Sequence, residues 1–138
     1  MKLKIKLDRG AIMPTRAHRT DAGLDLYTQT KITIWPFDQK CIDTGVHVLI
    51  PEGYVGLLTS KSGLMRDKGI VSTGTIDAGY TGSIKAVLFN RTGRIVEIEA
   101  GKKITQLVVF PIVTPELETV DELPETDRAD GGFGSSGL

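Results

Sequence analysis

The sequence predicts an all-β fold, a barrel or sandwich of many short strands. Apolar residues recur in short runs, and most of them alternate with polar residues at the period of a half-buried strand. Gly- and Pro-containing turn signals separate the runs, and the sequence shows neither a long helical periodicity nor an internal repeat. The length of 138 residues favours a single domain, residues 1–138, that can bury a real core.

The expected strands follow one another from the N-terminus. They are residues 3–7, 24–27, 32–35, 46–50, 55–58, 83–89, 95–98 and 104–113. The first strand alternates lysine with leucine or isoleucine, which suits a sheet edge because edge lysines discourage aggregation. One short helix is expected, with Ser62 as its N-cap, residues 63–68 as its turns and Gly69 as its C′ residue, before a strand resumes at Ile70.

Residues 74–90 are the most informative stretch and predict a β-hairpin. Residues 77–82, Asp-Ala-Gly-Tyr-Thr-Gly, make the turn, and residues 83–89 alternate as a strand. Asp77 and Tyr80 stand at the tip, where a carboxylate and a phenol in a rigid turn can hold a water and a cyclic ligand together. A structural turn alone also explains the composition, because Asp and Gly are favoured there for backbone reasons.

The composition changes near the C-terminus. Residues 115–127 form an acidic connector that contains prolines, and residues 128–138 form a Gly-rich tail. A segment of this composition cannot bury a core of its own. We therefore expect a tail that is disordered in isolation and becomes ordered only where a ligand or a neighbouring subunit holds it.

Charge and cysteine content exclude several classes of protein. Seventeen basic residues balance seventeen acidic ones, so no basic stripe is available to bind nucleic acid. Cys41 is the only cysteine, which excludes an intrachain disulfide and a zinc ribbon, and His18 and His47 are too isolated for a histidine metal cluster. No signal peptide and no apolar run of membrane-spanning length is found, so we expect a cytoplasmic protein without a membrane partner.

Five separated segments together resemble the five motifs of the trimeric dUTP diphosphatases (dUTPases), in the same order and over essentially the whole chain. They are residues 22–27, 60–65, 74–90, 101–107 and 128–137. The resemblance implies a distorted jelly-roll β-barrel of the dUTPase-like β-clip type, assembled as a homotrimer whose C-terminal tails reach neighbouring subunits. It also implies Mg²⁺-dependent hydrolysis of dUTP to dUMP and pyrophosphate, by in-line attack of a water on the α-phosphate.

The resemblance also assigns roles to individual residues. Asp77 is expected to orient and deprotonate the water, and Asp25 to contact Mg²⁺ through bound waters. The contacts to uracil and deoxyribose fall on Thr75, Ile76, Tyr80, Lys85 and Phe133. The contacts to the phosphates fall on Lys61, Ser62, Gly63, Gln106, Arg128, Gly134, Ser135 and Ser136.

The chain departs from the family pattern at a few positions. Lys61 stands where relatives carry Arg, which keeps the charge but gives up the bidentate fork on a phosphate. Ala129 replaces a common Gly, and Ser136 replaces a common Thr. Residues 69–77 lack an Asn that many bacterial relatives carry before the hairpin, so one base or sugar contact is expected to be supplied differently.

Two alternative functions remain open. A dCTP deaminase shares the fold and the nucleotide handling, although residues 60–70 give no support for its deamination motif and it does not need the Gly-Gly-Phe-Gly tail. The second alternative is a non-hydrolysing nucleotide sensor or partner-binding protein on the same scaffold. The retained Asp77, Tyr80 and tail argue against a loss of catalysis, but they leave room for a protein partner that the sequence does not identify.

Overall fold

The computed structural model describes residues 1–134, 136 and 137, and strands dominate the chain up to Pro111. The strands are β1 (Lys4–Leu7), β2 (Gly23–Tyr27), β3 (Ile32–Ile34), β4 (Gln39–Leu49), β5 (Tyr54–Ser60), β6 (Ile70–Ile76), β7 (Ser83–Asn90), β8 (Val96–Ile98) and β9 (Lys103–Pro111). Among the described residues the only helix is α1 (Ser62–Lys68), which lies between β5 and β6.

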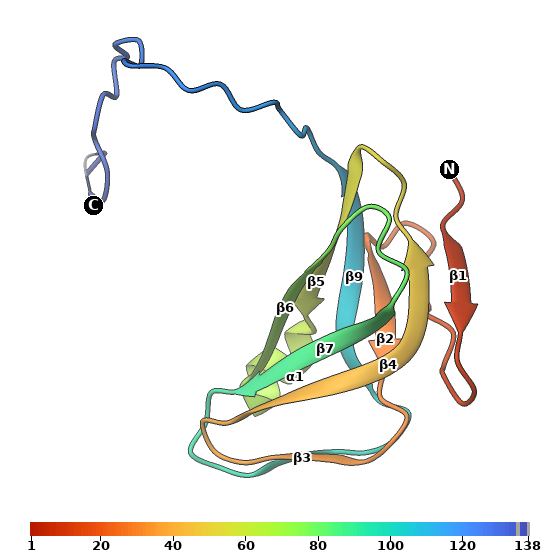
Figure 1. The fold of residues 1–138 in the computed structure, drawn as a ribbon. Helices are drawn as coiled ribbons and strands as arrows, with labels where there is room; N and C mark the ends of the chain where they lie inside the picture. The colour runs from red at the N-terminus through yellow and green to blue at the C-terminus, as the bar shows by residue number, and fades with distance from the viewer. Residues whose placement is uncertain (135, 138) are drawn as a thin grey trace.

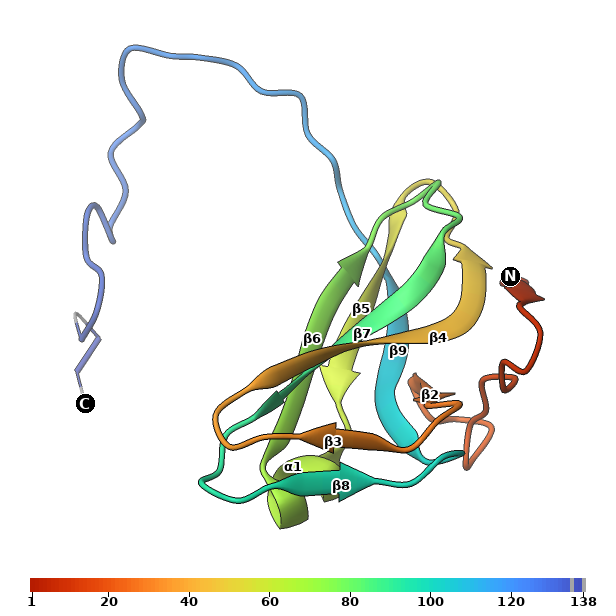
Figure 2. The ribbon, with the colours of Figure 1, turned by 60° about the horizontal axis from the view of Figure 1, so that its bottom comes forward.

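Seven strands form one antiparallel sheet, in the order β1-β4-β7-β6-β5-β9-β2. The sheet curls, and β3 and β8 pair as a second small sheet that lies across its lower end (Figures 1 and 2). This architecture confirms the predicted all-β class. The described part of the chain contains no helix long and apolar enough to cross a membrane.

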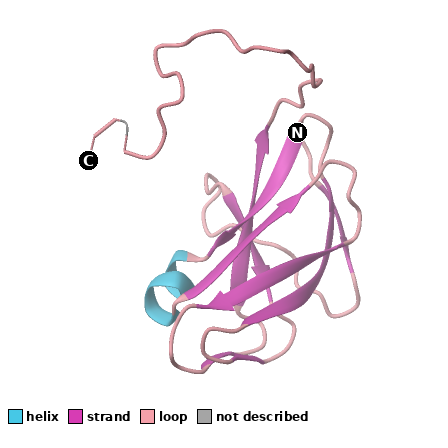
Figure 3. Cartoon of the chain, turned by 60° about the vertical axis from the view of Figure 1, so that its left-hand side comes forward, coloured by secondary structure: helices cyan, strands magenta, loops and turns pink. Residues whose placement is uncertain are grey.

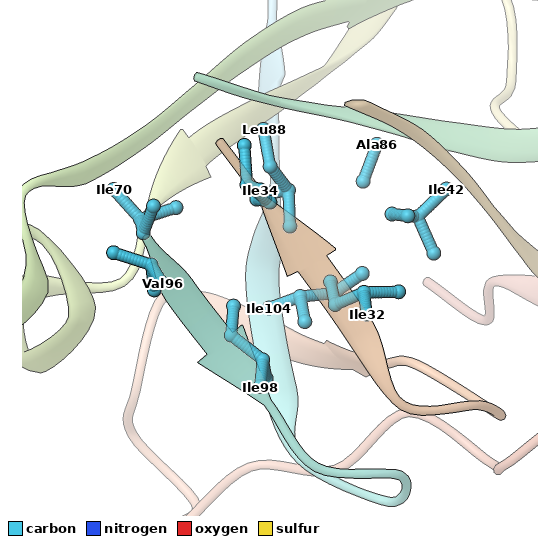
Figure 4. Packing of buried hydrophobic residues seen from close by; sticks show 9 residues of the cluster. All are labelled: Ile32, Ile34, Ile42, Ile70, Ala86, Leu88, Val96, Ile98 and Ile104. Carbon is cyan, nitrogen blue, oxygen red and sulfur yellow. The ribbon is translucent and has the colours of Figure 1, made fainter. Parts of the chain in front are cut away.

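The core consists of two clusters of buried aliphatic side chains inside the curl. One fills the space between the small sheet and the large one (Figure 4), and its members are Ile32, Ile34, Ile42, Ile70, Ala86, Leu88, Val96, Ile98 and Ile104. The other lies further up the curl, and its members are Leu26, Val46, Val48, Ile50, Leu58, Ile76, Ile84 and Leu107. Since β7 contributes to both clusters with alternate residues, its inner face is the one that the hairpin pattern predicts.

β4 is longer than the sequence indicates, because it starts at Gln39 instead of residue 46. Its first three residues are exposed, so they carry no alternating apolar signal. Gly45 then has a φ of +66°, and the register with β7 shifts between Asp43 and His47. Inside this irregular stretch Thr44 is a buried polar residue, and its hydroxyl donates to the Ile84 carbonyl of β7 at 2.7 Å. A bulge and a buried polar residue therefore hide the strand from a pattern based on apolar alternation.

Beyond Pro111 the chain leaves the sheet and extends away from it as an exposed segment without helix or strand in its described part (Figures 1 and 3). Among the described residues, the last backbone hydrogen bond between this segment and the strand region is donated by the Ile112 amide to the Gly53 carbonyl at 2.9 Å. All further hydrogen bonds of the described tail residues are local, such as Arg128 Nε to the Gly131 carbonyl at 3.0 Å. The acidic connector and the Gly-rich tail thus lie outside the curled sheet.

Candidate active site

The predicted turn joins β6 to β7, but residues 74–76 of the predicted hairpin do not pair with β7, so the hairpin is open next to its tip. β6 and β7 pair from Ile70–Asn90 as far as Thr73–Val87, where their ladder ends among the described residues. Beyond that point β6 continues in pairing with β5, and β7 continues in pairing with β4. Two strand segments therefore diverge with their inner backbone edges turned toward one another. Unpaired strand edges present N–H donors and C=O acceptors, which is what a planar heterocycle with complementary groups requires.

The turn between these edges holds two of the predicted site residues in defined positions. The Tyr80 amide bonds to the Asp77 carbonyl at 3.2 Å, and the Tyr80 hydroxyl donates to the Ser83 carbonyl at 3.1 Å. The phenol ring folds over Gly82, where an added Cβ would collide with it. Gly79 has a φ of +80°, which glycine adopts without strain. Asp77 is exposed at the tip, so its carboxylate is available to water and ligands.

The remaining hairpin residues with predicted base or sugar contacts take different environments. Thr75 is exposed on β6, and Ile76 is buried in the core beside it. Lys85 is exposed on β7, opposite Asp43 of β4. The hairpin thus brings together Thr75, Tyr80 and Lys85 as accessible side chains, while Ile76 can contribute only through its backbone.

A second cluster forms where β2, β9 and the end of β5 lie side by side. Asp25 and Gln106 are directly paired across β2 and β9, and Gln106 is in turn opposite Thr59 of β5. The Gln106 side chain bonds weakly to the Ser60 carbonyl at 3.4 Å. It lies over Gly23, where an added Cβ would collide with it, so this glycine of the first motif makes room for the glutamine of the fourth.

Asp25 is the centre of this cluster and is buried, with 4% of its surface exposed. Its Oδ1 accepts from Lys61 Nζ at 2.5 Å, and its Oδ2 accepts from Lys103 Nζ at 2.7 Å. Burial alone would raise the pKa of the carboxyl group, but the hydrogen bonds from Lys103 and Lys61 outweigh it and hold that pKa below its usual value. The same contact raises the pKa of Lys103. The cluster therefore carries two positive charges and one negative charge.

Lys103 was not among the predicted site residues. Its signal in the sequence is weak, because Lys102 and Lys103 stand together and alternation alone does not decide which one turns toward β2. The structure shows that Lys103 is the lysine turned toward β2. It is paired with Tyr27 of that strand, and its ammonium group reaches Asp25. Among the described residues, no group of three or more His, Cys, Asp or Glu side chains is arranged to hold a metal ion.

Helix α1 starts beside Lys61 and differs slightly from the prediction. Ser62 is its first residue, and Lys61, with φ −74° and ψ 121°, takes the N-cap position. The prediction of Ser62 as N-cap is wrong, because the Lys61 carbonyl already accepts the first helical bond, from the Met65 amide at 2.9 Å. Gly69 ends the helix in the left-handed conformation, as predicted. Ser62 and Gly63 are exposed in the first turn, where backbone N–H groups have no helical partner.

The two clusters lie at opposite ends of β6. α1 and Lys61 precede this strand, and Asp77 follows it, so the hairpin turn and the helix stand apart in Figure 1. Seven residues of strand at about 3.3 Å each correspond to roughly 23 Å. A single chain therefore does not bring Asp77 to the Lys61–Asp25–Lys103 cluster.

The predicted tail residues also lie away from both clusters. Phe133 is fully exposed, and Arg128 bonds only within the tail among the described residues. Ala129 has a φ of +43°, which fits its place at a position where the family commonly has Gly. Gly134, with a φ of +77°, and Ser136 are exposed, and Ser135 lies outside the described residues.

The chain is similar over nearly its whole length to known dUTPases. The dUTPase family model matches residues 9–137. The sequence is 40% identical to the deoxyuridine 5'-triphosphate nucleotidohydrolase of Clostridium novyi, with 100% of both chains covered. The structure of the Staphylococcus bacteriophage 80alpha dUTPase with dUPNHPP is similar at a TM-score of 0.93 and 38% identity, and covers 99% of each chain.

A mutant dUTPase from phage phi11 of S. aureus, described with a structural Mg(II) ion, is also similar. It has 35% identity and a TM-score of 0.83, over 91% of this chain and 100% of that one. These similarities confirm the predicted fold type and enzyme class. The chain belongs to the dUTPase family, as its five motifs predict.

Proposed function

We propose that this chain is a Mg²⁺-dependent dUTP diphosphatase that hydrolyses dUTP to dUMP and pyrophosphate. The observation that carries the proposal is the opened hairpin, in which two free strand edges flank a turn that presents Asp77 and Tyr80. Membership of the dUTPase family gives the substrate class. The related phage 80alpha dUTPase with dUPNHPP supports the same assignment.

Recognition of the base rests on the backbone of the opened hairpin. The edges of β6 near Thr75 and Ile76 and of β7 near Lys85 supply donors and acceptors to the polar edge of uracil. Cytosine carries an amino donor where uracil has a carbonyl acceptor, so it would leave a buried group unpaired and be rejected strongly. Tyr80, held by its bond to the Ser83 carbonyl, would pack under deoxyribose and leave no room for a 2′-hydroxyl.

The chemical step needs a water in line with the α-phosphorus. Asp77 accepts a proton from this water while the water oxygen forms a bond to the α-phosphorus. The bond between the α-phosphorus and the oxygen that bridges it to the β-phosphorus breaks, and pyrophosphate leaves with that oxygen. The backbone bond between Asp77 and Tyr80 closes the turn that presents this exposed carboxylate, which supports the proposed role. This bond fixes the backbone from which the Asp77 side chain projects.

The phosphate chain would lie against the second cluster. Lys61 and Gln106, with the free backbone N–H groups at Ser62 and Gly63, would bind its oxygens. Both oxygens of Asp25 already accept bonds from lysines, so Asp25 fits a contact to metal-bound water better than direct ligation. Mg²⁺, held mainly by phosphate oxygens and water, would neutralise charge on the triphosphate.

The site is complete only in an assembly. The hairpin turn and the phosphate cluster are roughly 23 Å apart in one chain, and the described tail contacts neither. We therefore propose a homotrimer in which one chain supplies the hairpin, a second the phosphate cluster and a third the tail. There Arg128 would bind the terminal phosphate, Phe133 would stack on uracil, and residues 134–136 would wrap the phosphates. The tail would act as a lid over bound substrate.

Product analysis tests this function. The protein is incubated with Mg²⁺ and dUTP, dCTP, dTTP or UTP, and pyrophosphate and ammonia are measured. Pyrophosphate from dUTP alone is expected, whereas ammonia from dCTP would assign a deaminase and binding without turnover a nucleotide sensor. Asp77→Asn should bind dUTP but turn it over at least about a hundredfold more slowly. The matched change Asp121→Asn, at an exposed connector residue, should leave the rate unchanged.

A further inference from the structure

The turn that carries Asp77 and Tyr80 is tied to the N-terminal segment through the imidazole of His47 on β4. His47 Nδ1 lies 2.8 Å from the Thr81 carbonyl oxygen, and Nε2 lies 3.0 Å from Asp8 Oδ2. The His47 side chain is 18% exposed and the Asp8 side chain 48%, so the ring is partly shielded while the carboxylate is open to water. One ring thus bridges the segment after β1 and the turn after β6.

The chemistry of the two partners defines the protonation state that makes both contacts. A backbone carbonyl accepts hydrogen bonds and donates none, and an ionised carboxylate does the same. Both ring nitrogens must therefore carry a proton, which is the imidazolium form. The neutral ring has a single N–H, so it can keep only one bond and turns a lone pair toward the other oxygen.

The bonds to Thr81 and Asp8 also raise the pKa of His47 above its usual value. A raised pKa in the folded state means that the clamp is fully formed below the ordinary histidine pKa of about 6.5 and is lost as the pH rises through the folded-state value. The direction is thus fixed: acid closes the clamp and alkali opens it.

Other charged groups surround this ring from the elements packed against it. Lys6 of β1 pairs directly with His47 across the strands and opposes its protonation. Asp43, on β4, is near enough to interact with His47, but its carboxylate is engaged by the Ser83 hydroxyl and the Gly45 amide. Lys85 of β7 faces Asp43 and offsets its charge. The Thr81 and Asp8 contacts consequently dominate.

We propose that His47 is a pH-dependent positioning residue, whose imidazolium clamps the Thr81 end of the substrate turn to Asp8. Thr81 directly follows Tyr80 in the turn. The Ser83 carbonyl accepts a hydrogen bond from the Tyr80 hydroxyl, and Ser83 is paired with His47 across β4 and β7. After loss of one proton, the charge-assisted bond to Asp8 keeps the remaining N–H on Nε2, so Nδ1 turns a lone pair toward the Thr81 carbonyl and the turn is released. Release of the turn weakens substrate binding more than it slows turnover. This role rests on the proposed function of the turn, but the clamp itself can be tested without substrate.

The first test is a pH titration of the substrate-free protein followed by nuclear magnetic resonance. The sequence has two histidines, so His18→Gln leaves His47 as the only one. His18 is an exposed residue, so this substitution should not disturb the fold. We expect imidazole ¹⁵N signals of a doubly protonated ring that persists above pH of about 6.5, and the amides of Thr81 and Gly82 should shift with the same midpoint. Asp8→Asn should lower this midpoint. A midpoint unmoved by Asp8→Asn, or amides that do not follow it, would overturn the clamp.

The second test is the pH profile of dUTP hydrolysis. The KM of the wild-type protein should rise about two- to tenfold through the His47 midpoint, as expected for one net hydrogen bond, with a smaller change in kcat. His47→Gln, which does not titrate, should lose this step, and His18→Gln should keep it. The terminal phosphate of the substrate also titrates near neutral pH and affects every variant alike. The quantity to compare is therefore the ratio of the variant KM to the wild-type KM at each pH.

The two tests separate the possible failures. An identical KM step in His47→Gln and the wild-type protein would refute the positioning role. If neither protein hydrolyses dUTP, the proposed function fails, and the resonance titration alone decides the clamp.

Discussion

The most exacting test of the Lys61–Asp25–Lys103 cluster is Asp25→Asn, which removes one charge with almost no change of shape. Asp25 is buried, and its two oxygens bind Lys61 Nζ at 2.5 Å and Lys103 Nζ at 2.7 Å. An asparagine has one acceptor oxygen, and its NH₂ group would face an ammonium donor. The substitution therefore loses at least one strong contact and leaves two positive charges without their shared partner.

The magnitude follows from the exposure of the three groups. Removing one partner of a fully buried ion pair costs about 3–5 kcal/mol, because the other charge remains uncompensated. Here the lysine side chains are 25% and 41% exposed, so both can turn partly toward water and recover hydration. Exposed pairs contribute only about 0–1 kcal/mol. We expect Asp25→Asn to lower the free energy of unfolding by about 2–3 kcal/mol at neutral pH, between these limits.

The pH dependence of this loss has a definite sign. Burial opposes ionisation of Asp25, but the bonds from Lys103 and Lys61 leave its folded-state pKa below the usual value. A lowered pKa contributes stability above the unfolded-state value of about 3.9, and this contribution disappears as the pH falls through the folded-state value. The gap between wild type and Asp25→Asn should therefore be full near neutral pH and shrink in strong acid.

Urea unfolding at one fixed chain concentration measures this gap, since assembly makes the midpoint depend on concentration. Asp67→Asn is the matched control, because Asp67 has the same side chain in an exposed pair with its neighbour Arg66. The control should change the free energy of unfolding by less than about 0.5 kcal/mol. A loss below about 1 kcal/mol for Asp25→Asn, or an equal gap at neutral and strongly acid pH, would refute the reasoning.

Two further predictions concern the core and the assembly. Asn90 is completely buried, its two N–H donors are shared among three backbone carbonyls, and its Oδ1 accepts from Thr92. Asn90→Ala should therefore lower the free energy of unfolding in urea by about 2–4 kcal/mol, and a loss under about 1 kcal/mol would contradict this role. Asp77→Asn and a chain without residues 128–138 should each be nearly inactive alone, but refolding them together in equal amounts should complete about a quarter of the sites if hairpin and tail come from different chains. No recovery of dUTP hydrolysis in the verified mixed trimer would show that one chain supplies both.

Local patterns predicted the parts of the fold that depend on alternation. The apolar face of β7 and the glycine that ends α1 follow from spacing and from the conformational freedom of glycine. The first half of β4 did not, because its exposed start and the buried Thr44 carry no apolar period. The helix cap was misplaced by one residue, since Lys61 supplies its backbone carbonyl and no side chain caps the helix.

Within the candidate site, too, features that lie in one stretch of sequence could be predicted, and features that depend on strand pairing could not. Asp77 and Tyr80 could be proposed from the sequence because the turn and its polar residues lie in one continuous stretch. The opening of the hairpin could not be read there, because it depends on β6 leaving β7 for β5 while β7 continues along β4. Lys103 was missed for a similar reason: only the register of β9 against β2 brings its ammonium group to Asp25.

The cluster also gives a physical reason why Lys, in place of Arg, is suitable at residue 61. An ammonium group has three N–H donors, and Lys61 directs one of them to Asp25, so donors remain for phosphate oxygens. A guanidinium that bound Asp25 through its planar fork would keep donors as well, but in fixed directions that point away from that carboxylate. The lysine, a compact charge on a flexible stem, can contact both acceptors at once. Asp25 thus holds two cations in place. In the proposed function, the one net positive charge of the cluster would attract the triphosphate.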